Sequence, residues 1–380
     1  MTTYAIIGGG IAGTTAAEAI REQDSAGDIH LFETEASRLY SRILLPNYLA
    51  GRSAKEGLVI RNEQWYTDRK INLNTEATVA SIDKDAKKVL LSENSAQPYD
   101  KLLLATGARS FVIPFPGHEL PGVLSMCTID DVEKLKQEAE GEKNAVVIGG
   151  GLLGLEMASG LSHLGLNVTV IEIFPWLLPR QLDKEGGDVL KTILEEQGLD
   201  FRLDAKVASI NGTNHVESIQ LEGGEQLATK VILVSAGIRP NLDLAKEAGI
   251  QVDKGIVIDD SAATSHPDIF AAGDCTEHKG RIYGIWPAAE AQGRVAGTVM
   301  GGGTAAFTGI APSHRLKVSG VDLFSIGEFD KDDENRFERV AGEKTYRKVV
   351  FNSKGNPIGA ILIGDLKERS KLSQEINASK

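Results

Sequence analysis

Short apolar runs alternate along this chain with glycine-rich turns and with longer stretches rich in alanine or leucine. The run "YAII", which begins at Tyr4, is followed by "GGGIAG" and "TTAAEAIRE", and the run "AVVI", which begins at Ala145, is followed by "GGGLLG" and "LEMASGLSHLG". A short apolar run bounded by glycines is typical of a buried strand, and the longer stretch after the turn is typical of a helix. A further apolar run, "IHLF" or "NVTVI", follows each helix and ends at a glutamate. The pattern predicts the same succession of strand, turn, helix and strand twice.

Both turns have the spacing G-x-G-x-x-G, which suits the binding of a dinucleotide. The first glycine makes the tight turn, the second lets the backbone approach a pyrophosphate, and the third lets the helix pack on the strand. The helix N-terminus then offers unpaired N–H groups and a positive dipole end to the phosphates. A glutamate about twenty residues further on can accept hydrogen bonds from the adenosine ribose hydroxyls. The sequence therefore predicts two bound dinucleotides, one at Gly8, Gly10, Gly13 and Glu33, and one at Gly149, Gly151, Gly154 and Glu172.

The second of these units is nested inside the first. After the first unit, "KKVLLSENSAQPYDKLLLATGAR" predicts a hairpin that ends in a strand and in the turn Thr106-Gly107. Only after the second unit does "TSHPDIFAAGDC" predict another strand, which delivers Asp274 to its carboxyl end, followed by the helix "WPAAEAQGRVAGTVM", opened by Pro287. We therefore expect the first domain to be discontinuous in sequence.

Composition and charge narrow the classes of function. A chain of 380 residues with 42% apolar and 25% charged residues predicts two or three globular domains. No apolar stretch has the length of a membrane span, and nothing near the N-terminus is typical of a signal peptide, so we expect a cytoplasmic protein. A net charge of −12 argues against nucleic acid as a partner. The two cysteines, Cys127 and Cys275, exclude a disulfide scaffold, and without a C-x-x-C motif we expect no metal site.

The motifs "LLLATGAR", "VSAGIRPN" and "DIFAAGDC", in this order and together with both glycine turns, resemble the FAD-dependent pyridine nucleotide-disulfide oxidoreductase superfamily. The resemblance covers the chain up to about Phe307. It implies an α/β fold of two Rossmann-like three-layer nucleotide-binding domains, with the NAD domain nested in the FAD domain, and a small α+β C-terminal domain. The boundaries that follow are 1–112 and 237–306 for the FAD domain, 113–236 for the NAD domain and 307–380 for the C-terminal domain.

The resemblance also assigns cofactor-binding residues. It implies that FAD is held by Gly8, Gly10, Ala12, Gly13, Glu33, Arg42, Val79, Ala105, Thr106, Gly107, Asp274, Pro287 and Ala288. The nicotinamide coenzyme would be held by Gly149, Gly151, Leu153, Gly154, Glu156, Glu172 and Gly237. Because a carboxylate at Glu172 would repel a 2′-phosphate, NADH is favoured over NADPH. Arg42 and Glu156 are also candidates for tuning the flavin and the nicotinamide, and no residue is assigned as an acid or base.

The stretch "RLYSRILLPNYLAG" holds no cysteine where the disulfide reductases, and the NADH oxidases and peroxidases, of this superfamily carry redox thiols. Cys127 and Cys275 are interpreted as packing residues, because free cysteine is among the most buried residue types. Without a thiol relay the flavin would pass electrons directly to an external one-electron carrier. The chain is thus interpreted as an NADH-dependent FAD reductase.

The carrier favoured by the resemblance is rubredoxin, because the tail, with "PIGAILIGDL", resembles the rubredoxin reductase and nitrite-reductase-like branches. A ferredoxin reductase or the flavoprotein subunit of a nitrite reductase-like system is an alternative, although Leu45-Pro46-Asn47 departs from the Leu-Ser-Lys of ferredoxin reductases. A flavin-bound sensing protein like apoptosis-inducing factor and an NADH oxidase also stay open. Rubredoxins are usually acidic, so the predicted docking patch is basic, with candidates Arg38, Arg52, Arg315 and Lys317.

Overall fold

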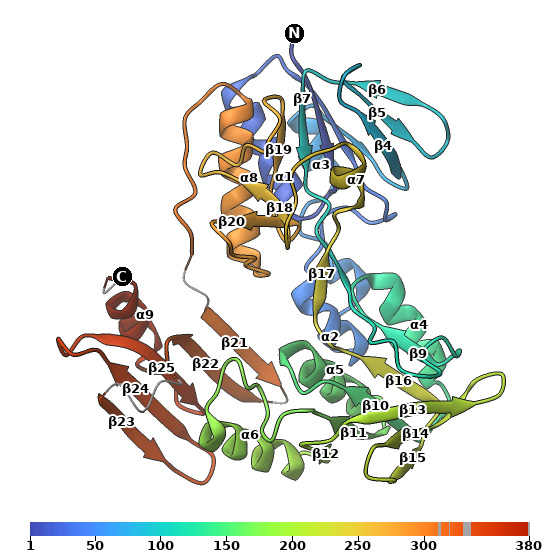
Figure 1. Ribbon diagram of the computed structural model, residues 1–380, viewed down its shortest axis with the longest axis vertical. Helices are drawn as coiled ribbons and strands as arrows, with labels where there is room; N and C mark the ends of the chain where they lie inside the picture. The colour runs from blue at the N-terminus through green and yellow to red at the C-terminus, as the bar shows by residue number, and fades with distance from the viewer. Residues whose placement is uncertain (311–312, 319, 330–335, 379–380) are drawn as a thin grey trace. The chain divides into compact units, whose positions relative to one another are not determined.

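The chain forms two compact units in a computed structural model that describes residues 1–310, 313–318, 320–329 and 336–378, with residues 313–318 described by their backbone alone. The first unit comprises residues 1–41, 56–109 and 238–310, and the second comprises residues 42–55, 110–237 and 311–380. Figure 1 shows the course of the chain through both. Among the described residues, no helix combines the length and the apolar character needed to cross a membrane.

The first unit is built on a five-stranded parallel sheet in the order β19-β7-β1-β2-β3. Its buried strands carry Ile, Leu and Phe on both faces, as expected for parallel strands covered on both sides. Helices α1 and α8 pack closely (Figure 1). Gly293 of α8 permits this, since a Cβ there would lie only 2.2 Å from the carbonyl oxygen of Ala12. The elements of this unit are β1 (Thr3–Ile7), α1 (Ile11–Gln23), β2 (Asp28–Phe32), α3 (Glu63–Asp68), β3 (Ile71–Asn74), β4 (Val79–Asp83), β5 (Lys88–Leu91), β6 (Ala96–Pro98), β7 (Lys101–Leu104), α7 (Asp243–Glu247), β18 (Ile256–Ile258), β19 (Ile269–Ala271), β20 (Thr276–His278) and α8 (Trp286–Met300).

The second unit repeats this architecture with a parallel sheet in the order β12-β11-β10-β16-β9. In both sheets the strand that precedes the glycine turn lies at the centre, and its two neighbours follow it in the chain. Its elements are β9 (Val123–Ser125), α4 (Ile129–Ala139), β10 (Asn144–Ile148), α5 (Leu152–His163), β11 (Asn167–Ile171), α6 (Lys184–Glu196), β12 (Leu199–Arg202), β13 (Val207–Gly212), β14 (Val216–Leu221), β15 (Gln226–Ala228) and β16 (Val231–Val234). Strands β8 (Ala108–Ser110) and β17 (Ile238–Pro240) pair where the chain passes from one unit to the other and back.

The segment Arg42–Lys55, expected within the FAD domain, groups with the second unit. It contains the short helix α2 (Leu45–Leu49), which packs on α4 and α5. Gly160 of α5 leaves room for Leu49, because a Cβ there would lie 2.9 Å from the Leu49 Cδ2 atom. The hydroxyl of Tyr48 donates to the carboxylate of Glu133 on α4. These contacts join α2 to helices that lie more than eighty residues further along the chain.

The C-terminal part of the second unit is a five-stranded antiparallel sheet in the order β21-β22-β25-β24-β23. Its elements are β21 (Ser313–Val318), β22 (Val321–Gly327), β23 (Arg336–Ala341), β24 (Tyr346–Phe351), β25 (Pro357–Ile363) and α9 (Arg369–Ala378). Leu372 and Ile376, one turn apart on α9, are buried against this sheet. The predicted fold class, two Rossmann-like domains with a small α+β C-terminal domain, is confirmed, whereas the predicted domain boundaries stay a prediction.

Candidate dinucleotide-binding sites

The first glycine turn joins β1 to α1 beside the end of β7. Gly8 adopts a φ of +107°, and a Cβ there would lie 2.1 Å from the carbonyl oxygen of Ala105, so only glycine fits this position. A Cβ on Gly13 would lie 2.0 Å from the carbonyl oxygen of Gly8. Gly10 is different, because no atom lies within 4 Å of the Cβ position there. The backbone at Gly10 therefore borders open space at the N-terminus of α1, where no side chain caps the helix.

The second turn, between β10 and α5, reproduces these three roles. A Cβ on Gly149, whose φ is +116°, would lie 2.3 Å from the carbonyl oxygen of Ser235, and one on Gly154 would lie 2.1 Å from that of Gly149. Around the Cβ position of Gly151 the space is again empty to 4 Å, and α5 begins without a side-chain cap. Both turns thus leave open space that a pyrophosphate could occupy, and a helix N-terminus lies beside that space in each. Each open turn with its helix N-terminus is called a cradle below.

The two glutamates are held in the same way. One carboxylate oxygen of Glu33 accepts the N–H of Gly9 at 2.7 Å, and the other accepts the N–H of Glu35 at 3.0 Å. Glu172, only 6% exposed, accepts the N–H of Gly150 at 2.7 Å and that of Phe174 at 3.0 Å. Each carboxylate is therefore fixed beside its glycine turn at the end of the second strand. This is the position from which a carboxylate binds the ribose of a dinucleotide.

The other residues predicted for FAD occupy the first unit, with one exception. Ala12 lies in the first turn of α1, Val79 begins β4, Ala105 follows β7, Asp274 follows β19, and Pro287 and Ala288 lie in the first turn of α8. The exception is Arg42, which lies in the second unit and donates to the carbonyl oxygen of Cys127.

Thr106 and Gly107, between β7 and β8, are held by a residue that the sequence analysis did not single out. Asn241 donates through its side-chain amide to the carbonyl oxygen of Thr106 at 2.8 Å, and the Thr106 hydroxyl donates to the carbonyl oxygen of Asn241 at 2.9 Å. The N–H of Asn241 also donates to the carbonyl oxygen of Gly107 at 3.0 Å. Asn241 ends the motif "VSAGIRPN", so the motif held the signal, but the separation of 135 residues hid the partner.

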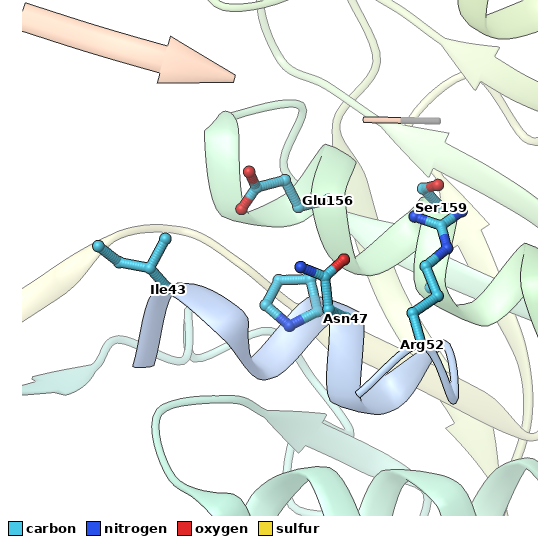
Figure 2. A pocket seen from close by; sticks show the side chains of 7 residues that line it. Ile43, Asn47, Arg52, Glu156 and Ser159 are labelled. Carbon is cyan, nitrogen blue, oxygen red and sulfur yellow. The ribbon is translucent and has the colours of Figure 1, made fainter. Parts of the chain in front are cut away.

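The residues predicted for the nicotinamide coenzyme all lie in the second unit. Leu153 and Glu156 lie in the first two turns of α5, and Gly237, with a φ of +96°, follows the end of β16. Glu156 lines a small pocket between α2 and α5 (Figure 2), together with Ile43, Pro46, Asn47, Arg52, Ser159 and Gly160. Its volume of about 30 Å³ has room for water. Figure 2 shows the side chain of Arg52 extending from the α2 segment toward Ser159.

Both cysteines are free thiols. The side chain of Cys275 is fully buried, and burial raises the pKa of its thiol to about 11, so it stays protonated at neutral pH. Cys127 is partly buried, with its sulfur 3.6 Å from the guanidinium of Arg42. Since the thiolate is the reactive form, Cys275 has the environment of a packing residue, as predicted. Among the described residues, no group of three or more metal-ligating side chains gathers.

Two parallel sheets, each with its own glycine turn and glutamate, define a class of protein that binds two dinucleotides. The family described as pyridine nucleotide-disulphide oxidoreductase matches residues 2–293, and the rubredoxin NAD+ reductase C-terminal domain matches residues 312–380. The chain therefore belongs to the pyridine nucleotide-disulphide oxidoreductase family, as its motifs predicted.

Relatives of known sequence and structure agree with this membership. The chain is 38% identical to a nitrite reductase (NAD(P)H) of Bacillus subtilis over 372 residues, which are 97% of this chain and 46% of that protein. It is 31% identical to the NADH-rubredoxin oxidoreductase of Clostridium acetobutylicum over 380 residues, which are 100% of this chain and 95% of that protein. The crystal structure of the NADH:rubredoxin oxidoreductase from Clostridium acetobutylicum matches with a TM-score of 0.85 and 30% identity, covering 100% of this chain and 96% of that one. This chain spans less than half of the Bacillus protein.

Proposed function

We propose that this protein is an NADH-dependent FAD reductase that passes electrons to a small one-electron carrier, with rubredoxin as the favoured carrier. The observation that carries the proposal is the repeated cradle: two open glycine turns, each with a fixed carboxylate, in a chain without a pair of redox thiols. The clostridial relative, similar over 95% of its length, supports the choice of carrier. The cytoplasm is the proposed location.

FAD fits the first unit. Gly10 and the N-terminus of α1 would hold its pyrophosphate, Glu33 its adenosine ribose, and the turn at Thr106 and the Asp274 side chain would lie along the rest. Helix α8 begins at Trp286 with no side-chain cap, and its positive dipole end would stabilise negative charge on the flavin. When bound, FAD supplies the conversion from a two-electron donor to a one-electron acceptor. The work of this chain is positioning and electrostatics rather than acid or base chemistry.

NADH fits the second unit. Gly151 and the N-terminus of α5 would bind the pyrophosphate, and Glu172 would accept hydrogen bonds from the adenosine ribose. A carboxylate fixed by two backbone N–H donors leaves no place for the extra phosphate of NADPH, because two negative charges would lie side by side. We therefore propose NADH as the electron donor. Leu153, Glu156 and Gly237 would complete the site.

The proposed docking site for the electron acceptor consists of basic residues. Of the basic residues considered for docking, Arg38 pairs with Glu63 at 2.7 Å, and Arg52 contacts the His163 ring. Arg315 and Lys317 have side chains outside the described residues. The second candidate, electron supply to a nitrite reductase, rests on the Bacillus relative, of which this chain spans less than half.

An anaerobic titration tests the proposal directly. The protein loaded with FAD should be bleached at the flavin absorbance by one equivalent of NADH, and NADPH at the same concentration should react at least tenfold more slowly. Failure of the protein to retain FAD, or faster reduction by NADPH, would overturn the assignment of the two cradles.

A further inference from the structure

A buried ionic cluster ties the C-terminal sheet to the first turn of α6. One carboxylate oxygen of Asp183 accepts the Tyr346 hydroxyl at 2.7 Å and the Lys348 ammonium at 2.9 Å. The side chain of Lys348 is 0% exposed and that of Asp183 is 14% exposed. The other carboxylate oxygen caps α6 by accepting the N–H of Gly186 at 3.0 Å. Asp183 thus caps the helix and fastens the sheet with the same carboxylate.

The backbone next to this cluster leaves space for the Tyr346 ring. Gly186 stands in the first turn of α6, and a Cβ there would lie 3.2 Å from the Tyr346 ring. A side chain at that position would therefore crowd the ring. Burial and the neighbouring Asp183 raise the pKa of Tyr346, so its hydroxyl remains a hydrogen-bond donor throughout the physiological range. Two exposed ion pairs join the same elements, Arg339 to Glu185 at 2.7 Å and Lys344 to Glu196 at 2.5 Å.

The loop of residues 173–182 begins directly after Glu172 and ends directly before Asp183. The loop returns to the second glycine turn, where the N–H of Leu178 donates to the carbonyl oxygen of Gly150 at 3.3 Å. The indole N–H of Trp176 donates to the carbonyl oxygen of Leu182 at 3.2 Å, beside Asp183. The loop is therefore held at one end by Glu172 and its turn, and at the other end by the cluster.

Leu178 shows that this loop is under constraint. Its φ is +53° although it is a fully buried leucine. A bulky residue adopts this left-handed conformation only where the surroundings enforce it, and such residues gather at binding sites. The N–H groups of Gln181 and Leu182 both donate to the carbonyl oxygen of Leu178 at 2.8 Å, directly before Asp183, so the conformation of Leu178 is tied to the segment that the cluster holds.

We propose that Asp183, Tyr346 and Lys348 are positioning residues for the nicotinamide coenzyme, through which the C-terminal sheet holds the loop 173–182 against the adenosine end of the site. The inference rests on the proposed function, because it takes the second glycine turn as the NADH site. It gives the C-terminal sheet a part in coenzyme affinity. A weakened cluster loosens the loop beside Glu172 and so weakens the ground-state binding of NADH, while the transfer of electrons from bound NADH keeps its rate.

The test separates affinity from rate in the FAD-loaded protein. Tyr346→Phe removes only the hydroxyl and keeps the packed ring, and Lys348→Met removes the buried charge. The dissociation constant for NADH and the limiting rate of flavin reduction come from the same anaerobic stopped-flow series. We expect Tyr346→Phe to raise the dissociation constant about five- to tenfold, with the limiting rate within twofold of the wild type. The matched control is Arg339→Gln, which breaks an exposed pair of the same interface and should leave both quantities unchanged.

Three outcomes overturn the inference. They are an unchanged dissociation constant in Tyr346→Phe, a fall in the limiting rate with unchanged affinity, and an equal loss of affinity in the Arg339→Gln control. Since Lys348→Met can lose its fold, its urea midpoint is measured first, and Tyr346→Phe carries the decision if the midpoint collapses. Failure of the proposed function is distinguishable, because the wild type itself would then show no saturable reduction by NADH.

Discussion

Gly151 offers the sharpest test at the scale of single residues. Its Cβ position is open to 4 Å, so the Gly151→Ala protein should fold with a free energy of unfolding within ~0.5 kcal/mol of the wild type. The added methyl group would occupy the space where the pyrophosphate approaches the backbone, so the dissociation constant for NADH should rise at least tenfold. Urea unfolding and equilibrium binding measure the two quantities.

Gly223→Ala is the matched control, since Gly223 lies in the same unit with nothing within 4 Å of its Cβ position. It should change neither stability nor affinity. Wild-type affinity in Gly151→Ala would contradict the placement of the pyrophosphate.

The two glutamates form a second pair of matched positions. Glu172→Gln removes the charge that excludes a 2′-phosphate and weakens the hydrogen bonds to the ribose, so NADH affinity should fall about tenfold, ~1.4 kcal/mol, and the preference over NADPH should shrink. Glu33→Gln should instead release FAD during gel filtration and leave NADH affinity unchanged. Competition binding on the FAD-loaded proteins measures both effects. The opposite pattern would show that the two cradles had been assigned to the wrong dinucleotides.

The residues of these cradles could be predicted because their roles depend on spacing alone. Gly8 and Gly149 lie against the carbonyl oxygens of Ala105 and Ser235, which follow the neighbouring strands β7 and β16. The sequence places both glycines directly after a strand, at the start of the glycine turn. The contacts of Asp183, Asn241 and Arg42 could not be predicted in the same way. Each of these residues is fixed by a partner at least 85 residues away, and a single sequence carries no record of such pairs.

At the scale of elements, α4 and the β13–β14 hairpin are joined by an ion pair that depends on pH. His215, between the two strands, contacts Glu138 of α4 at 2.9 Å, and the hydrogen bond to this carboxylate raises the pKa of the histidine. A raised pKa in the folded state means that the stabilisation is complete below the ordinary histidine pKa and is lost as pH rises through the higher value. Because both side chains are about one-third exposed, the effect should be small, ~0.5 kcal/mol.

Urea denaturation between pH 5.5 and 8.5 measures this effect. The wild type should lose the increment as the pH rises, and both His215→Asn and Glu138→Gln should remove that part of the pH dependence. A wild-type curve parallel to both variants would contradict the role of the pair.

The position of α2 could not be predicted from the order of its residues in the sequence. Its residues precede the second glycine turn by about a hundred positions, and their order in the sequence put them in the FAD domain. The contacts that decide their place are those of Leu49 with Gly160 and of Tyr48 with Glu133. Strands and helices with a strong apolar period could be predicted directly, whereas a short helix of five residues takes its position from what it packs against.

At the scale of the whole molecule, the two similar parallel sheets and the C-terminal sheet have different roles in the proposed function. In the proposed function one cradle would hold FAD, which stays bound, and the other would take NADH, which comes and goes. The stretch "RLYSRILLPNYLAG" holds no cysteine that could relay the electrons. Electrons are therefore expected to leave the flavin directly, one at a time, to a protein from outside. Because the family includes thiol reductases and oxidases, direct transfer to a carrier is what distinguishes the proposed function.

Anaerobic stopped-flow at the flavin absorbance tests this direct transfer of electrons. The protein reduced by NADH is mixed separately with oxidised rubredoxin, a plant-type ferredoxin and a coenzyme A disulfide. We predict rapid reoxidation by rubredoxin, slowed by added salt because the proposed docking pairs a basic patch of this chain with an acidic carrier, and no rapid reoxidation by the disulfide. Rapid reoxidation by the disulfide, or by none of the three, would contradict direct transfer to a one-electron carrier.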